Sequence, residues 1–174
     1  MLNSLLYVLI YCNYGNSIDS LKGFLLSSLL IVIAGIDLKT HYIYKSTTIF
    51  GIGAFVFIEI IDLLILWQIP WENLLAGALG VIVIGAIVFF TGGMGEGDIE
   101  IALIIGLFLG IKGLMLALFI AFILGGIIAS IFLILKFKER KAEIAFGPYL
   151  AMGAIISLLY STEIINWYIS LMKI

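Results

Sequence analysis

The sequence is poor in the residues that usually cross-link a fold, bind metals or break helices. Among its 174 residues are one cysteine (Cys12), one histidine (His41) and two prolines. A single cysteine excludes an intrachain disulfide and a four-cysteine zinc site, and the lone histidine has no partner cluster that would support a metal site. No long basic stretch with interleaved aromatic residues points to nucleic acid. We therefore expect no cofactor, no metal and no nucleic-acid partner.

Charge is scarce as well. Charged residues make up 11% of the chain and hydrophobic residues 64%, and the mean hydropathy is +1.29. A soluble domain has roughly a quarter charged residues and about half apolar ones. This apolar excess is too large for a globular core to bury. The composition therefore predicts an integral membrane protein in which residues 1–174 form one all-α domain surrounded by the lipid bilayer.

Long apolar runs predict the membrane helices, because a bilayer core of about 30 Å requires roughly 20 apolar helical residues. Full-length spans are predicted at residues 20–37, 47–67, 73–91, 113–135 and 145–160. Shorter spans are predicted at 2–13 and at 98–111, the latter ending in a tight turn at Ile111–Gly113, and an interfacial segment at 164–172. The N-terminal run has no basic region and no small-residue cleavage site, so we interpret it as a short membrane segment rather than a signal peptide. The expected fold is a polytopic helical bundle of six or seven transmembrane segments.

Lysine and arginine in the loops predict the orientation. The loop after Asp37 carries Lys39 and Lys45, and the loop 136–141 carries four further basic residues. Alternation of the helices places both loops, and the loop before Asp98, on one side of the membrane. The opposite side carries only Lys22 and Lys112, apart from a lysine at the C-terminus. Because basic loops are retained in the cytoplasm, we expect Asp37 and Asp98 at the cytoplasmic face of the cell membrane.

Two carboxylates stand out at this boundary. Asp98 follows the glycine-rich stretch 92–97, and Asp37 closes the apolar run 25–36. Either residue alone is often only a solvated helix end, but an ionisable residue at a membrane boundary is a functional hypothesis by default. Two carboxyl groups that face each other across a wet pocket can activate water for amide hydrolysis, one ionised and one protonated. The glycines also allow close approach of an extended peptide.

The helix ends suggest which carboxyl group is ionised. Asp98 is predicted to open a helix, where the macrodipole favours negative charge, and Asp37 to end one, where it disfavours it. The hypothesis is that Asp98 is ionised and Asp37 holds the proton. It requires that the helix carrying Asp37 does not continue past it.

The two carboxylates lie in motifs that resemble a known family. Gly95-Glu96-Gly97-Asp98 is the GxGD motif of membrane aspartic proteases, and the longer run from Gly93 resembles the prepilin peptidase (type IV leader peptidase) branch. Ile36-Asp37-Leu38, with Ile43 six residues after the aspartate, resembles the first-aspartate motif of that family, and Phe146–Gly153 resembles its FGPFLALG segment. The resemblance implies an endopeptidase that removes the short basic leader of type IV prepilins or pseudopilins. It further implies that Asp37 and Asp98 are catalytic and that Gly95, Glu96 and Gly97 contact the substrate.

The chain departs from this family pattern in three places. Ile43-Tyr44-Lys45 stands where the family commonly has Ile-Pro-Asp/Asn, and Glu100 stands where it usually has lysine. Glu100 adds a third carboxylate close to the pair. The single cysteine also excludes the cysteine-rich N-methyltransferase domain of many bacterial members. We therefore expect peptidase activity without methylation.

Three alternatives remain. An archaeal-type preflagellin peptidase would share the chemistry and differ in substrate. A small proton-coupled transporter could relay protons through paired aspartates, but such proteins tend to have internal repeats and a midplane site, and no repeat is found here. An inactive scaffold would not need both aspartates.

Other polar and small residues have simpler interpretations. Glu59 and Asp62 are expected toward the extracytoplasmic end, where they reach the interface or hydrogen-bond within the bundle. His41 is interpreted as a solvated loop residue. Phe146–Tyr149 is interpreted either as part of the substrate entry or simply as a helix start with Pro148 near its first position. The GxxxG motif Gly106–Gly110 is interpreted as close helix packing.

Overall fold

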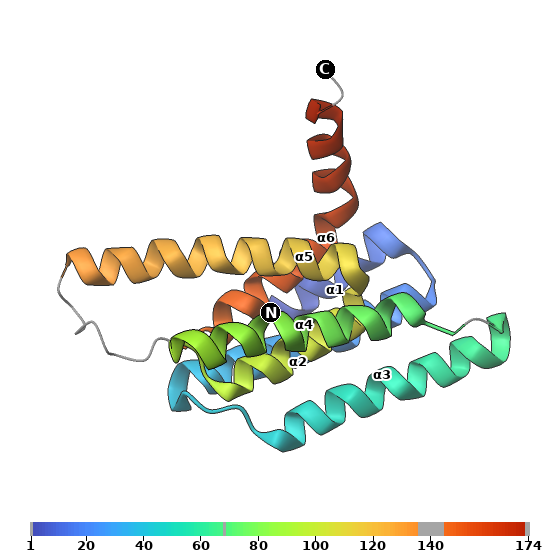
Figure 1. Cartoon of the computed structure of the whole chain (residues 1–174). Coiled ribbons are helices and arrows are strands. Elements are labelled where there is room, and N and C mark those ends of the chain that lie inside the picture. The colour runs from blue at the N-terminus through green and yellow to red at the C-terminus, as the bar shows by residue number, and fades with distance from the viewer. Residues whose placement is uncertain (1, 68, 136–144, 173–174) are drawn as a thin grey trace.

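The computed structural model describes residues 2–67, 69–135 and 145–172. Within these ranges the chain forms six helices and no strand (Figure 1): α1 (Leu2–Tyr14), α2 (Ile18–Thr40), α3 (Lys45–Leu66), α4 (Trp71–Thr91), α5 (Glu96–Ile134) and α6 (Gly147–Met172). The predicted all-α fold is confirmed. The basic loop 136–141 lies outside the described residues.

Five of these helices, α2 to α6, are long and apolar enough to cross a membrane. The longest, α5, consists of two helical segments joined at Gly110, whose φ of 68° and ψ of −176° are not helical. The predicted six or seven segments correspond to these five helices, with α5 counted twice and α1 added. The chain is therefore a polytopic helical membrane protein. The 13-residue α1 is shorter than a span of about 20 residues, and it packs against α2 and α6.

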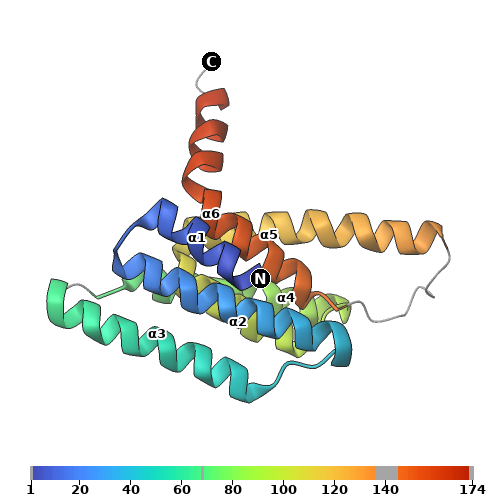
Figure 2. The ribbon, with the colours of Figure 1, turned by 180° about the vertical axis from the view of Figure 1, so that it is seen from behind.

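Two predicted boundaries are wrong. The break in α5 lies at Gly110, whereas the predicted turn at Ile111–Gly113 is helical. A φ near 68° is readily adopted only by glycine, so the break falls on this residue. The predicted segments 145–160 and 164–172 form one continuous helix, α6. Its C-terminal part turns away from the other helices (Figures 1 and 2) and exposes Trp167 and Tyr168.

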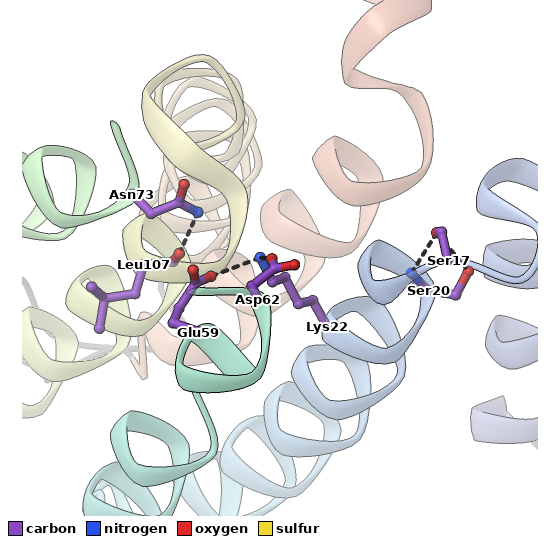
Figure 3. A network of polar contacts seen from close by, with 7 residues as sticks. All are labelled: Ser17, Ser20, Lys22, Glu59, Asp62, Asn73 and Leu107. Carbon is purple, nitrogen blue, oxygen red and sulfur yellow. Dashed lines mark hydrogen bonds and ion pairs between the residues drawn. The ribbon is translucent and has the colours of Figure 1, made fainter. Parts of the chain in front are cut away.

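Polar side chains from neighbouring helices bind the backbone near the break in α5. Asn73 of α4 donates its Nδ2 to the carbonyl of Leu107 at 2.6 Å (Figure 3), and Ser157 of α6 donates its hydroxyl to the carbonyl of Gly113 at 2.7 Å. In lipid, a backbone group without an internal partner costs several kcal/mol. These two contacts therefore help the chain to reverse direction at the break in α5.

Glycines allow α4, α5 and α6 to pack closely. A Cβ atom on Gly80 of α4 would lie 2.6 Å from the carbonyl oxygen of Ala102 in α5. Gly106 of α5 meets the backbone of α4 at Ala76, and Gly153 of α6 meets the carbonyl of Ala117. The packing interpretation of the GxxxG motif is thus confirmed for its first glycine. Its second glycine instead forms the break.

Helix α3 lies at the side of the bundle (Figures 1 and 2), where it packs against α2 and α5. Lys22 of α2 lies 2.7 Å from Glu59 and 3.2 Å from Asp62, both on α3 (Figure 3). The expectation that these two acids bond within the bundle is confirmed. Near the other end of α3, Thr48 donates a hydrogen bond to Glu100 of α5. Polar contacts therefore hold α3 toward both of its ends.

Candidate active site

A cavity of about 330 Å³ lies at the end of the bundle where α2 and α4 finish and where α5 and α6 begin. Both Asp37 and Asp98 line it. Four short stretches complete the wall: the α2–α3 connection, the α4–α5 connection, the first turn of α5, and Ala145–Phe146 before α6. The prediction that the two carboxyl groups converge at one end of the bundle is confirmed.

Asp37 lies in the last turn of α2 and is 5% exposed. The helix does not end at Asp37 as predicted. It continues to Thr40 and is closed by His41, which has a left-handed φ of 50° and donates its backbone N–H to the carbonyl of Asp37. The side chain of Asp37 accepts the N–H of Gly147 at 3.0 Å from Oδ2. A Cβ atom at Gly147 would lie 2.6 Å from the same oxygen, so only glycine fits there without a shift.

Asp98 lies in the first turn of α5, as predicted, and is 4% exposed. Its Oδ2 accepts the N–H of Gly95 at 3.1 Å, and its own N–H donates to the carbonyl of Gly95 at 3.1 Å. This reciprocal pair resembles the capping of a helix start by an acidic residue. It fixes the glycine-rich segment against the carboxyl group.

Both carboxyl groups therefore have a helix N-terminus beside them. Asp98 is at the start of its own helix, and Asp37 contacts the first residue of α6, Gly147. Positive partial charge at a helix N-terminus stabilises an anion. The prediction that helix ends give the two aspartates opposite roles is therefore wrong, because each has an N-terminus beside it and one backbone N–H bonded to it.

The three residues predicted to contact substrate all line the cavity. Gly95 binds Asp98 through its backbone, and Glu96 is exposed at the start of α5. Gly97 packs against Ile43, because a Cβ there would lie 2.7 Å from the Ile43 side chain. The glycine at position 97 thus leaves room for Ile43 of the α2–α3 connection and also forms part of the cavity wall. Substrate contact by these residues remains a prediction.

Other residues reach the cavity as expected from their loops. His41 is exposed and lines it, and so does Phe146. Tyr149 does not line the cavity but packs against Phe146, with ring centroids 6.0 Å apart. Within this segment only Phe146 lines the cavity, and α6 begins at Gly147, in agreement with the helix-start interpretation. A role in the substrate path stays a prediction.

Sequence reasoning missed two contributions. The N–H of Gly147 reaches Asp37 from 110 positions away, and Thr48 reaches Glu100 from 52 positions away. The resemblance of Phe146–Gly153 to a family segment was the available signal for Gly147, whereas nothing in the sequence marked Thr48. The structure also brings Lys45 and Glu100, two departures from the family pattern, to the same cavity.

Comparison with known proteins gives independent information. The profile of the type IV leader peptidase family matches residues 24–130. The chain is 29% identical over 159 residues to a prepilin leader peptidase/N-methyltransferase of Bacillus subtilis, which covers 91% of this chain and 63% of that protein. A protein of the same description from Xanthomonas campestris is 26% identical over 176 residues, an alignment that covers 97% of this chain and 60% of that protein. One from Legionella pneumophila is 40% identical over 76 residues, an alignment that covers 44% of this chain and 26% of that protein.

The matched family region contains the cavity-lining parts of α2, α3 and α5 and of the α4–α5 connection, including both carboxyl groups. The chain spans about 60% of the length of the Bacillus and Xanthomonas relatives. No solved structure matches it. Because the profile matches more than half of its residues, the chain belongs to the type IV leader peptidase family.

Proposed function

We propose that this protein is a membrane aspartic endopeptidase that cleaves the short basic leader from type IV prepilins or pilin-like precursors. The observation that carries the proposal is the convergence of Asp37 and Asp98 on one cavity at one end of the bundle. Family membership supports a peptidase, and the matched relatives are described as prepilin leader peptidases. The role of each aspartate is part of this proposal.

The chemistry follows from two carboxyl groups in a single cavity. Carboxylates held close together do not both ionise readily, so the pair shares a proton. The ionised member takes a proton from water as the water oxygen attacks the scissile carbonyl, and the protonated member donates to the carbonyl oxygen. The carbon–nitrogen bond then breaks, and the departing amine takes up a proton from the pair. Because each carboxyl group accepts one backbone N–H beside a helix N-terminus, either can start as the base.

The charges around the cavity fit a basic leader. Glu96, Asp98 and Glu100 all line it, so the first two turns of α5 present three acidic side chains. The hydrophobic helix of the precursor lies in the bilayer beside the enzyme, and its leader reaches the cavity from the same side of the membrane. The glycines of the α4–α5 connection leave room for an extended backbone.

The cavity end faces the cytoplasm in this proposal. Lys39 and Lys45 lie at that end, and Lys45 lines the cavity itself. At the opposite end Lys22 is paired with Glu59 and Asp62. The bias of basic residues toward the cytoplasmic side supports this orientation. The protein is then an enzyme of the cell (inner or plasma) membrane.

Cleavage of a co-expressed precursor tests the proposal. A prepilin with a basic leader is expressed with wild type, Asp37→Asn or Asp98→Asn, and processing is followed by its change in mass. Each substitution removes one half of the acid–base pair, so we expect cleavage to fall by about 10² to 10⁴-fold. Asp19→Asn is the matched control, because Asp19 is exposed at the opposite end of the same helix as Asp37. Cleavage that survives either active-site substitution refutes the proposed pair.

Two alternatives are included in this experiment. A preflagellin added as a second precursor separates an archaeal-type preflagellin peptidase from a prepilin peptidase, since the chemistry is shared. The transporter alternative predicts a site near the bilayer midplane. Asp37 and Asp98 instead lie at one end of the bundle, which favours the peptidase.

A further inference from the structure

Glu100 is a third carboxylate in the cavity, and its position is fixed by another helix. It lies two residues after Asp98 on α5 and is half-buried. Thr48 of α3, which is 6% exposed, donates its hydroxyl to Oε2 of Glu100 at 2.5 Å. A hydrogen bond from a buried hydroxyl restricts the rotamers of the glutamate. The carboxylate is therefore held at the cavity wall.

The charge of Glu100 has no cationic partner in the described part of the chain. Lys45, one turn before Thr48 on α3, lines the same cavity, but no ion pair joins it to Glu100 within 4.0 Å. Besides the Tyr42 phenol, the remaining titratable groups of the cavity wall are Asp37, His41, Glu96 and Asp98. Three of these four are acidic and oppose the charge of Glu100. A half-buried carboxylate among other acids is stabilised when a bound molecule supplies a positive charge.

The position of Glu100 along α5 sets the distance of that charge from the reacting bond. Two helical residues rise only about 3 Å along the axis but are turned about 200° around it, so Glu100 lies to one side of Asp98 at nearly the same depth of the cavity wall. An extended peptide advances about 3.3 Å per residue. A cationic side chain that reaches Glu100 while the scissile bond lies at Asp37 and Asp98 therefore belongs to one of the residues nearest that bond.

We propose that Glu100, positioned by Thr48, is a specificity-determining residue that pairs with a lysine or arginine side chain of the leader next to the scissile bond. This inference rests on the proposed peptidase function, and it assigns recognition of the basic leader residue next to the cleaved bond to Glu100. Thr48 acts as the positioning residue. Glu96, which is exposed on the preceding turn, contributes only general attraction.

Two precursors that differ in one leader residue test the inference. One carries lysine as the basic residue nearest the cleaved bond, and the other carries glutamine there. The ratio of their kcat/KM values is measured with purified wild type, Glu100→Gln, Thr48→Val and Glu96→Gln in detergent. We expect wild type to favour the lysine precursor, and Glu100→Gln to reduce this preference about tenfold or more, as expected for loss of a charged hydrogen bond. Thr48→Val should reduce it in the same direction by a smaller factor, mainly through KM.

A charge reversal gives a result that simple damage cannot imitate. Glu100→Lys should cleave a third precursor, with glutamate at the tested position, better than wild type does. The inference is overturned if wild type shows no preference, if Glu100→Gln lowers both rates equally, or if Glu96→Gln changes the preference and Glu100→Gln does not. These outcomes are distinct from failure of the proposed function, which appears as continued cleavage by Asp37→Asn or Asp98→Asn.

Discussion

At the scale of single residues, Gly147 is a position where any larger side chain would disturb the active site. Its N–H binds Asp37, and a Cβ atom there would lie 2.6 Å from Asp37 Oδ2 and 3.0 Å from the side chain of Ile101. Gly147→Ala must therefore push the carboxyl group away from its position. Because misplacement of a reacting group by about 1 Å can cost about 10²-fold in rate, we expect precursor cleavage to fall by about that factor.

The matched control for Gly147→Ala is Gly126→Ala. A Cβ on Gly126 meets no atom within 4 Å, so cleavage by that variant should equal wild type. Thermal unfolding in detergent is measured for both proteins, to separate a displaced carboxyl group from a lost fold. Full activity of a folded Gly147→Ala variant would show that the contact with Asp37 does not matter for the reaction.

The sequence predicted the identity of the paired residues better than their surroundings. Two carboxylates at the ends of apolar runs are a local signal, and both were found in one cavity. The helix past Asp37 was missed because the predicted span ended with the apolar run. No glycine or proline at 38–42 stops the helix, and His41 closes it in a left-handed conformation. Contacts of Gly147 and Thr48 depend on helices that meet only after folding, so no local pattern encodes them.

At the scale of elements, apolar length predicted the helices because lipid offers no other partner for the backbone. The same rule does not say how a helix is anchored to its neighbours. Helix α3 exposes many large apolar side chains, including Ile49, Phe50, Phe57 and Leu64. Such surface contacts lipid and gives little preference for one neighbour, so polar contacts and close packing hold α3 to α2 and α5. Of these, the Lys22–Glu59–Asp62 cluster could not be predicted from spacing along the chain.

The cluster gives a prediction about the attachment of α3. In Lys22→Met, Glu59 and Asp62 lose their cation while remaining largely buried. Removing one partner of a buried ion pair costs about 3–5 kcal/mol, and we expect unfolding in detergent to shift by an amount near the lower end of that range, since these side chains retain some exposure. Lys39→Met, an exposed change on the same helix, should leave stability unchanged.

A double variant distinguishes the cluster from simple loss of packing. Lys22→Met combined with Glu59→Met removes charges of both signs, so it should recover part of the stability lost in Lys22→Met. If the two losses simply add, the ion pair is not what holds α3 in place.

At the scale of the whole molecule, the arrangement of helices makes one prediction about membrane orientation. The ends of α2 and α4 and the start of α6 lie at the cavity end, whereas the α1–α2 connection lies at the other (Figures 1 and 2). Lys39 is exposed at the cavity end and Asn16 at the opposite end. The positive-inside bias and a substrate whose leader stays in the cytoplasm both place Lys39 on the cytoplasmic side.

Labelling of introduced cysteines tests this orientation without reference to catalysis. Cys12 is exposed and is first replaced by serine. Lys39→Cys or Asn16→Cys is then added, and a membrane-impermeant maleimide is applied to intact cells and to inverted vesicles. Lys39→Cys should react only in inverted vesicles, and Asn16→Cys only in intact cells. The reverse labelling pattern would place the carboxyl pair on the extracytoplasmic side, where a leader that stays in the cytoplasm cannot reach it. That result would contradict the proposed orientation even if Asp37 and Asp98 were essential for cleaving a soluble peptide.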